Sequence, residues 1–209
     1  MATNQKVRPK SWIECKNYIV DNKLTSKGEK ELIRRPELTE KYKKDKIEKL
    51  KLYIKYVDFI KHKFLGFDVE KIKINSNNSN DTNNMNGVYK LKAINKDSSY
   101  NYNNIALNDF GYYLDPLITH YVLWSTHSMS KYDIKNKMKI EYPFMDYLWW
   151  KNAINVQTIP EIWHVHILAK YNKNALLFHG FIRNDILNHT DCKIPHNLII
   201  VMNAYLSDS

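Results

Sequence analysis

Two histidines stand two residues apart in an apolar run, IWHVHILA, at residues 162–169. In an extended strand, residues i and i+2 point to the same side, so His164 and His166 share one face of a predicted strand. The residues that alternate with them are apolar and predict a core face on the other side. Imidazoles serve as nucleophiles, as general bases or as metal ligands. The first face is therefore expected to meet a cleft, a ligand or another layer.

Two flanking segments add polar residues to this pair. NAINVQT (152–158) precedes the strand, and LDPLITHYVLWS (114–125) lies upstream with His120 in it. Together the segments resemble the histidine-triad (HIT) nucleotide hydrolases and transferases, in which the middle histidine of a triad attacks the α-phosphorus of a nucleotide. The resemblance implies a HIT-like sheet and a nucleotide or nucleotide-sugar substrate. It makes His164 and His166 catalytic. It makes four residues substrate-binding: His120, Asn152, Gln157 and Thr158.

One histidine of the triad is missing. If Ile162 takes the first position of the triad, His164 is the nucleophile. If Leu168 takes the last position, His166 is the nucleophile. A protein that binds a nucleotide or an amino sugar without reacting with it is the alternative to an enzyme.

A second resemblance spans residues 25–170. Leu32, Arg34, Leu38 and Tyr42 match a pattern of the N-acetylglucosamine-induced protein family, and two later blocks, residues 108–124 and 149–166, match in order and spacing. This resemblance implies a family linked by name to the N-acetylglucosamine response, and it supplies no reaction.

Two further chemistries fit the same residues. His120, His164 and His166 are an alternative ligand set for Zn²⁺, Fe²⁺ or Mn²⁺, which makes a divalent metal the alternative cofactor. Trp150 offers an aromatic face on which a base or a sugar could stack. Arg34 and Arg35 are candidates for a phosphate clamp, with charge at a helix end as the other interpretation.

The charge is concentrated in the first third of the chain. The net charge is +10, and 20 of the 32 Lys and Arg lie in residues 1–75 with 11 of the 22 Asp and Glu. A nucleic-acid partner for the basic N-terminal helices and a solvated lysine-rich surface are both compatible with this bias. With two distant cysteines and no apolar signal or membrane-spanning run, we expect a cytoplasmic protein without a membrane partner.

The predicted elements divide the chain at residue 75. Capping-box signals at Ser11 and Ser26 predict two short helices, and a longer helix is predicted from Glu37 to Leu65, with Gly66 as its stop. The apolar stripe of the long helix comprises Ile47, Leu50, Ile54, Val57, Ile60 and Phe64.

A polar low-complexity loop (75–87) follows the helical region. Strands are predicted at 88–94, 119–125, 147–152 and 162–169, and the last two suit an antiparallel pair. A terminal helix is predicted after Pro195. The fold class expected is therefore α+β, with an N-terminal helical layer (1–74) packed on a mostly antiparallel sheet (88–209) in one folded domain.

Overall fold

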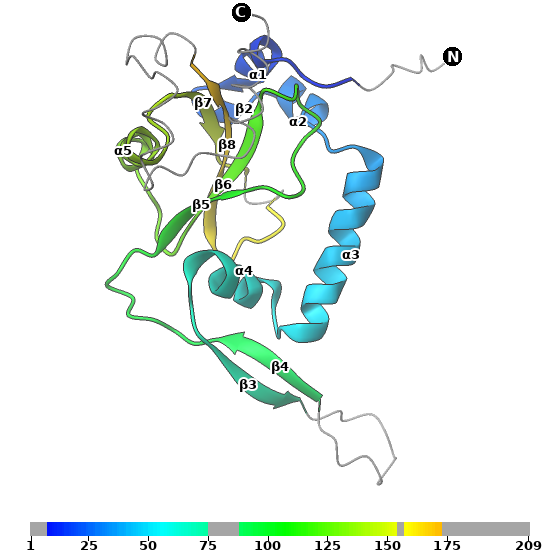
Figure 1. Cartoon of the computed structure of the whole chain (residues 1–209), viewed down its shortest axis with the longest axis vertical. Helices are drawn as coiled ribbons and strands as arrows, with labels where there is room; N and C mark the ends of the chain where they lie inside the picture. The colour runs from blue at the N-terminus through cyan, green and yellow to red at the C-terminus, as the bar shows by residue number, and fades with distance from the viewer. Residues whose placement is uncertain (1–7, 75–87, 154–156, 173–209) are drawn as a thin grey trace, which may run out of the picture. The chain divides into compact units, whose positions relative to one another are not determined.

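The computed structural model describes residues 8–74, 88–153 and 157–172, and it confirms the α+β class (Figure 1). The described residues form two compact units. The first comprises residues 8–129 with 147–170, and the second comprises residues 130–146 with 171 and 172. The predicted loop at 75–87 and the predicted terminal helix lie outside the described residues.

The first helix, α1 (Trp12–Tyr18), begins with the predicted capping box. Ser11 N–H donates to the Glu14 carboxylate at 3.0 Å, and Glu14 N–H donates to Ser11 Oγ at 3.4 Å. The helix ends at Tyr18 because the chain turns into a short hairpin of β1 (Ile19–Val20) and β2 (Lys23–Leu24). Asp21 and Asn22 make the turn with φ values of 49° and 62°, which Asp and Asn tolerate better than most residues.

The second helix, α2 (Ser26–Glu31), is capped one residue earlier than predicted. Thr25 is the N-cap, and its hydroxyl accepts a hydrogen bond from Gly28 N–H at 3.0 Å. Ser26 is therefore the first residue of the helix.

The prediction of one long helix from Glu37 to Leu65 is wrong. The segment forms α3 (Pro36–Leu52) and α4 (Tyr56–Leu65). The chain breaks between them because Ile54 N–H donates to the carbonyl of Leu91 at 2.9 Å, a contact with a distant strand. The predicted apolar stripe is split as a result: Ile47 is 58% exposed, whereas Val57 and Ile60 are buried.

Helix α4 ends at Gly66 as predicted, with φ at 65°. The chain then enters β3 (Val69–Ile74), which pairs in antiparallel fashion with β4 (Val88–Ala93). The prediction of β4 is confirmed, whereas β3 was not expected in the helical third of the chain.

A four-stranded sheet carries the histidines. Its order is β5 (Asn103–Leu107), β6 (Thr119–Ser125), β8 (Trp163–Tyr171), β7 (Met145–Trp150), and β6 is antiparallel to both of its neighbours. Three of these strands were predicted, and β5 was not. The second unit contains α5 (Lys131–Glu141), also not predicted, with a capping box formed by Ser130 and Asp133.

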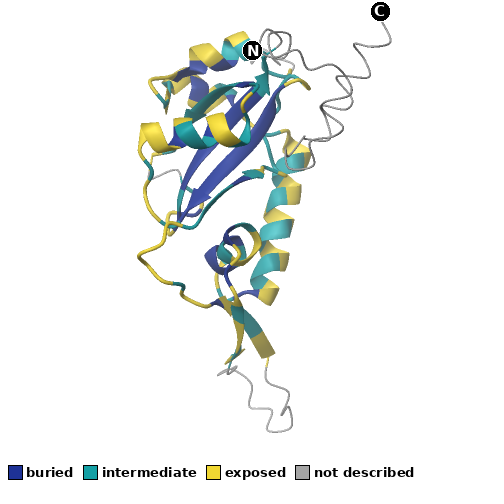
Figure 2. Ribbon diagram, turned by 60° about the vertical axis from the view of Figure 1, so that its left-hand side comes forward, coloured by how far each residue is buried: buried dark blue, intermediate teal, exposed yellow. Residues whose placement is uncertain are grey.

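The two central strands, β6 and β8, are buried along most of their length on both faces (Figure 2). Of the three expectations for the histidine face of β8, namely a cleft, a ligand or another layer, this burial agrees with another layer. The register of β6 with β8 pairs His120 with Leu168, Val122 with His166 and Trp124 with His164. Residues that pair directly share a face, so all three histidines lie on one side of the sheet.

Two apolar clusters cover this histidine-bearing face. One contains Ile60 of α4 together with Trp124 and Ile162. The other contains Cys15 and Tyr18 of α1 with Trp150 and Leu168. The first cluster includes Trp124 of β6 and the second includes Leu168 of β8, so the histidines of these two strands lie within the packed interior of the first unit.

None of the described helices combines the length and the apolar character needed to cross a membrane.

Candidate functional site

His120 and His166 contact each other directly across the paired strands β6 and β8. His120 Nε2 lies 3.1 Å from His166 Nδ1, and the two side chains belong to residues only 5% and 8% exposed. One nitrogen must donate and the other must accept in this contact. The two imidazoles therefore have to adopt coordinated tautomers.

The contact belongs to a longer chain of polar groups. Trp150 Nε1–H donates to Asn152 Oδ1 at 2.9 Å, and Asn152 Nδ2 lies 3.1 Å from His166 Nε2. At the other end, the backbone N–H of Tyr112 points at His120 Nδ1 from 3.3 Å. The chain thus runs through four contacts from Trp150 to Tyr112.

This polar chain of side-chain and backbone groups has an N–H donor at each end, Trp150 Nε1–H and Tyr112 N–H. A neutral imidazole, like a carboxamide, offers one donor and one acceptor at the two positions in use. The four contacts therefore bring together five donors and three acceptors, and one contact must pair donor with donor whichever way Asn152 is turned. Protonation of His120 or His166 would add another donor, so the network favours both imidazoles in the neutral form.

Burial acts in the same direction. Desolvation lowers the pKa of His120 to about 3, with the Arg34 guanidinium as a smaller cause. Desolvation also lowers the pKa of His166 well below its ordinary value, helped by His120, His164 and Arg34. Protonation of either imidazole is therefore costly.

His164 has a different environment from the other two. Its Nδ1 lies 3.0 Å from the carbonyl oxygen of Ile162, so Nδ1 carries the proton and donates. In the neutral ring, Nε2 then holds a lone pair, and within the described residues it has no hydrogen-bond partner. Desolvation lowers the pKa of this imidazole too, against the opposing effect of the Ile162 carbonyl. The ring packs against Trp124, with centroids 4.9 Å apart.

Aromatic rings enclose the His120–His166 pair. Tyr112 stacks on His120 with centroids 4.8 Å apart, and Trp150 stacks on His166 at 5.1 Å. Trp150 is fully buried, so its ring contacts protein side chains and is not a free platform for a base or a sugar. Arg34 reaches the same layer, with its guanidinium 5.8 Å from the Tyr112 ring centre.

Most of the residues predicted for the site do come together. His120, His166, Asn152 and Trp150 form the polar chain, and Gln157 joins it by donating to the carbonyl of Asn152 at 2.6 Å. His164 lies beside His166, with ring centroids 5.8 Å apart. Thr158 is exposed at the surface.

The three histidines do not assemble into the alternative metal site. In the residues that the structure describes, no group of three or more His, Cys, Asp or Glu side chains is arranged to hold a metal ion. His120 and His166 instead direct ring nitrogens at each other.

Two residues near the histidines, Asn108 and Tyr112, were not predicted as site residues, and Arg34 was predicted only as part of a phosphate clamp. The Asn108 amide nitrogen lies 3.4 Å from His120 Nε2, and Arg34 Nε donates to the carbonyl of Phe110 at 2.6 Å. All three belong to the motifs that carried the second resemblance. Their place in these motifs was the signal in the sequence that could have identified them. The contact of Arg34 with Phe110 could not be predicted from spacing, because 76 residues separate the two.

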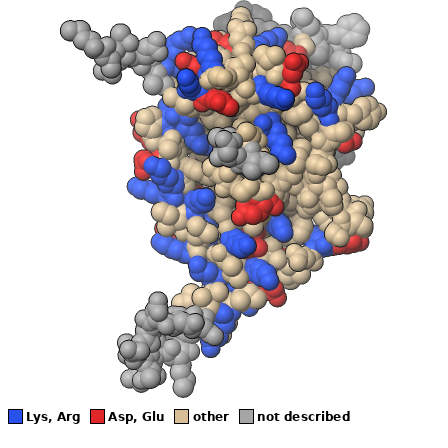
Figure 3. Space-filling model, turned by 180° about the vertical axis from the view of Figure 1, so that it is seen from behind, with Lys and Arg blue, Asp and Glu red and all other residues tan. Residues whose placement is uncertain are grey.

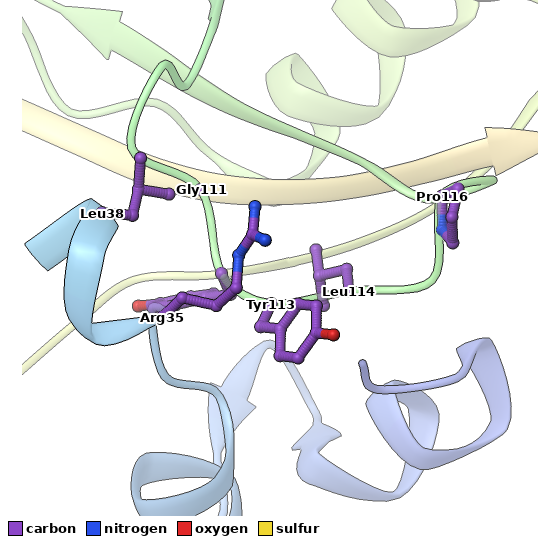
Figure 4. Close-up of a pocket in the computed structure, with 7 residues that line it drawn as sticks. Arg35, Leu38, Gly111, Tyr113, Leu114 and Pro116 are labelled. Carbon is purple, nitrogen blue, oxygen red and sulfur yellow. The ribbon is translucent and has the colours of Figure 1, made fainter. Parts of the chain in front are cut away.

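Two cavities adjoin the histidine layer, the set of rings formed by His120, His164 and His166 with Tyr112, Trp124 and Trp150. The Arg35 cavity, of about 310 Å³, is lined by Arg35, Leu38, residues 111–114 and Pro116 (Figure 4). It touches the layer through Tyr112. The Ile162 cavity, of about 450 Å³, includes Lys61, Lys96 and Ile162, the residue whose carbonyl holds His164.

Comparisons with known proteins bear on ancestry rather than chemistry. A solved structure described as "Crystal Structure of HTC1" aligns with a TM-score of 0.44 and 19% identity, over 82% of this chain and 97% of that chain. Among curated proteins, none matches the chain. A family model described as "Protein of unknown function (DUF3605)" matches residues 11–145, well over half of the sequence. The chain therefore belongs to the DUF3605 family.

Proposed function

We propose that the protein is an enzyme that cleaves or transfers at a phosphate bond of a nucleotide or nucleotide-sugar, with His164 as its nucleophile. The observation that carries this proposal is the contact of His164 Nδ1 with the Ile162 carbonyl. It fixes the tautomer in which Nε2 bears the lone pair, and a nucleophilic imidazole needs this kind of orientation.

The same contact favours one of the two triad alignments. Both ring nitrogens of His166 are engaged, one with Asn152 and the other with His120. His164 keeps one nitrogen available. This supports the alignment in which Ile162 takes the first triad position and His164 the nucleophilic one.

The reaction would run in two steps. In the first, a bond forms between His164 Nε2 and phosphorus while the bond from phosphorus to the leaving group breaks. In the second, water or another acceptor attacks the same phosphorus, and the nitrogen–phosphorus bond breaks. The Ile162 cavity includes the residue whose carbonyl holds His164. Its lining carries two cations, Lys61 and Lys96, which would contact a phosphate, and two acids, Asp97 and Glu161, which offset their charge.

Turnover of dinucleotide, nucleotide-sugar and nucleoside phosphoramidate substrates tests the proposal. His164→Ala should reduce turnover to background, because the nucleophile itself is removed. His62→Gln is the matched control, since His62 is an exposed histidine on α4 whose ring bonds to Tyr53, and turnover should be retained. Turnover by His164→Ala equal to that of the unaltered protein would reject the assignment.

A second candidate is a protein that binds a nucleotide or an amino sugar without reacting. The deep burial of the three imidazoles, all 5–8% exposed, favours it, because a reacting phosphorus must reach Nε2. Calorimetric titration with such ligands separates the two functions: saturable binding without product supports the second candidate, and product formation supports the first.

A further inference from the structure

We infer that the Arg35 cavity binds a small oxyanion, a phosphate or carboxylate group carried by a compact ring-bearing molecule. This site is separate from the chemistry proposed at His164 and does not depend on it. Three features support it: the cavity, the arginine that points into it, and the fixed wall opposite.

The arginines of the α2–α3 connection lack carboxylate partners in the described ranges. Each of the ion pairs found there joins other residues, such as Lys10 with Glu31 and Lys43 with Glu40. Arg34 instead lies 4.9 Å from the Tyr42 ring centre and donates Nε–H to a carbonyl. Neither Arg34 nor Arg35 therefore forms an ion pair within these ranges.

Arg35 is directed into the cavity. Figure 4 shows its guanidinium projecting into the space between Gly111 and Leu114. Its Cζ lies 5.1 Å from the ring centre of Tyr113, and stacking of this kind limits the freedom of the guanidinium before a ligand arrives. The donors of a planar guanidinium match the two oxygens of a carboxylate or a phosphate.

The remaining wall suits the uncharged part of such a ligand. Leu38, Leu114 and Pro116 are apolar, Tyr112 and Tyr113 are aromatic, and no acidic residue lines the cavity. A volume of about 310 Å³ lies at the small end of known ligand sites. The cavity therefore fits a single ring with one anionic group better than a whole dinucleotide.

The wall is held in place by backbone hydrogen bonds. Tyr113 N–H donates to the carbonyl of Ile33 at 2.9 Å, and the carbonyl of Tyr113 accepts from Lys10 N–H at 3.0 Å. A site formed before the ligand binds avoids part of the ordering cost of binding.

Calorimetric titration of the full chain at constant ionic strength tests the inference, with phenyl phosphate, benzoate and inorganic phosphate as probes. At least one should bind saturably. Binding of phenyl phosphate alone would identify a phosphate site, and binding of benzoate alone would identify a carboxylate site. Arg35→Ala should weaken binding at least about tenfold, the loss of a charge-assisted hydrogen bond.

Two variants separate recognition from net charge and from misfolding. Leu38→Trp should fill the cavity and abolish binding while keeping the charge. Lys43→Ala removes one positive charge from an exposed position on the same helix and should bind as the unaltered protein does. Thermal unfolding of each variant shows that it is folded. The inference is overturned if no probe binds saturably, or if folded Arg35→Ala and Lys43→Ala bind alike.

Discussion

The polar chain from Trp150 to Tyr112 is the least ordinary feature at the scale of single residues. Buried polar groups in folded proteins are almost always paired donor to acceptor. Here five donors share three acceptor positions, and the longest of the four contacts is the one between Tyr112 N–H and His120 Nδ1. The contact that pairs donor with donor should therefore be the one between Tyr112 N–H and His120 Nδ1. An oxygen of a ligand or of a water molecule would accept a hydrogen bond there and stabilise the network.

Asn152→Asp tests the donor count. A carboxylate accepts from both Trp150 Nε1–H and His166 Nε2–H, which allows His120 Nδ1 to accept from Tyr112 and matches all four contacts. The negative charge also favours the imidazolium form, so the pKa of His166 should rise above its value in the unaltered protein.

Ring nitrogen chemical shifts, followed by NMR from pH 8 to pH 4, measure that pKa. Asn101→Asp, an exposed position outside the polar chain, serves as the control and should leave His166 unchanged. If the pKa of His166 is the same in Asn152→Asp as in the unaltered protein, residue 152 does not contact the His166 ring as described.

The depressed histidine pKa values predict how stability depends on pH. Above the unfolded pKa of about 6.5, the three buried histidines, His120, His164 and His166, are neutral in both states and contribute no pH dependence. As the pH falls below that value, these histidines bind protons in the unfolded state but stay neutral in the folded state. The unfolded state is therefore stabilised, and the free energy of unfolding decreases. For His120 this loss extends down to the folded pKa of about 3.

Urea denaturation between pH 7.5 and pH 4.5 measures this decrease. Each buried histidine contributes up to about 1.4 kcal/mol per pH unit below the unfolded pKa. His120→Gln should make the slope shallower by roughly one proton. Equal slopes in the unaltered protein and His120→Gln would contradict the assignment of a neutral buried His120.

At the scale of elements, the break between α3 and α4 shows what the sequence did not reveal. Helical periodicity continues through the break, and the features that mark it are hydrogen bonds from Ile54, after α3, and Asp58, in the first turn of α4, to the distant strand β4. Strand β5 was missed for a similar reason, since its first residues are asparagines and Asn104 is held by a bond to the Phe64 carbonyl. Such tertiary contacts override local patterns.

A buried carboxylate also holds the chain at the break. Asp58, 7% exposed, accepts from Lys55 N–H at 3.0 Å and from Ala93 N–H at 3.1 Å, so it joins the start of α4 to β4. Asp58→Ala should lower the free energy of unfolding by about 2–3 kcal/mol, because two backbone donors lose a charged acceptor. Asp45→Ala, which removes a partly exposed ion pair with Lys49 on α3, should cost under about 1 kcal/mol. Comparable losses in urea denaturation would contradict this account of the break.

The candidate site was predictable in part. Strand alternation placed His164 and His166 on one face, and the register of β6 with β8 confirms that they share it with His120. Spacing could not show that His120 would bond directly to His166, because that contact depends on which residues of the two strands stand opposite each other. Tyr112 and Arg34 reach the layer from irregular segments, whose paths local sequence patterns do not specify.

At the scale of the whole molecule, the basic first third includes a lysine-rich helix, α3, which carries 6 of its 20 Lys and Arg. Lys43, Lys49 and Lys51 of α3 each pair with an acidic residue three or four positions earlier. Figure 3 shows Lys and Arg side chains mixed with Asp and Glu on the face it presents. This pattern is typical of a solvated, lysine-rich helix and gives less support to a nucleic-acid interface.

The central claim is that His164 Nε2 attacks phosphorus, and trapping of the covalent intermediate tests it most directly. The protein is mixed with a nucleoside phosphoramidate or a dinucleotide, quenched without acid to preserve the nitrogen–phosphorus bond, and measured by intact-mass and peptide mass spectrometry. We expect the added mass of one nucleotidyl group on His164, absent in His164→Ala and present in His62→Gln. A nucleotidyl group on His166 instead, or turnover by folded His164→Ala, would contradict it.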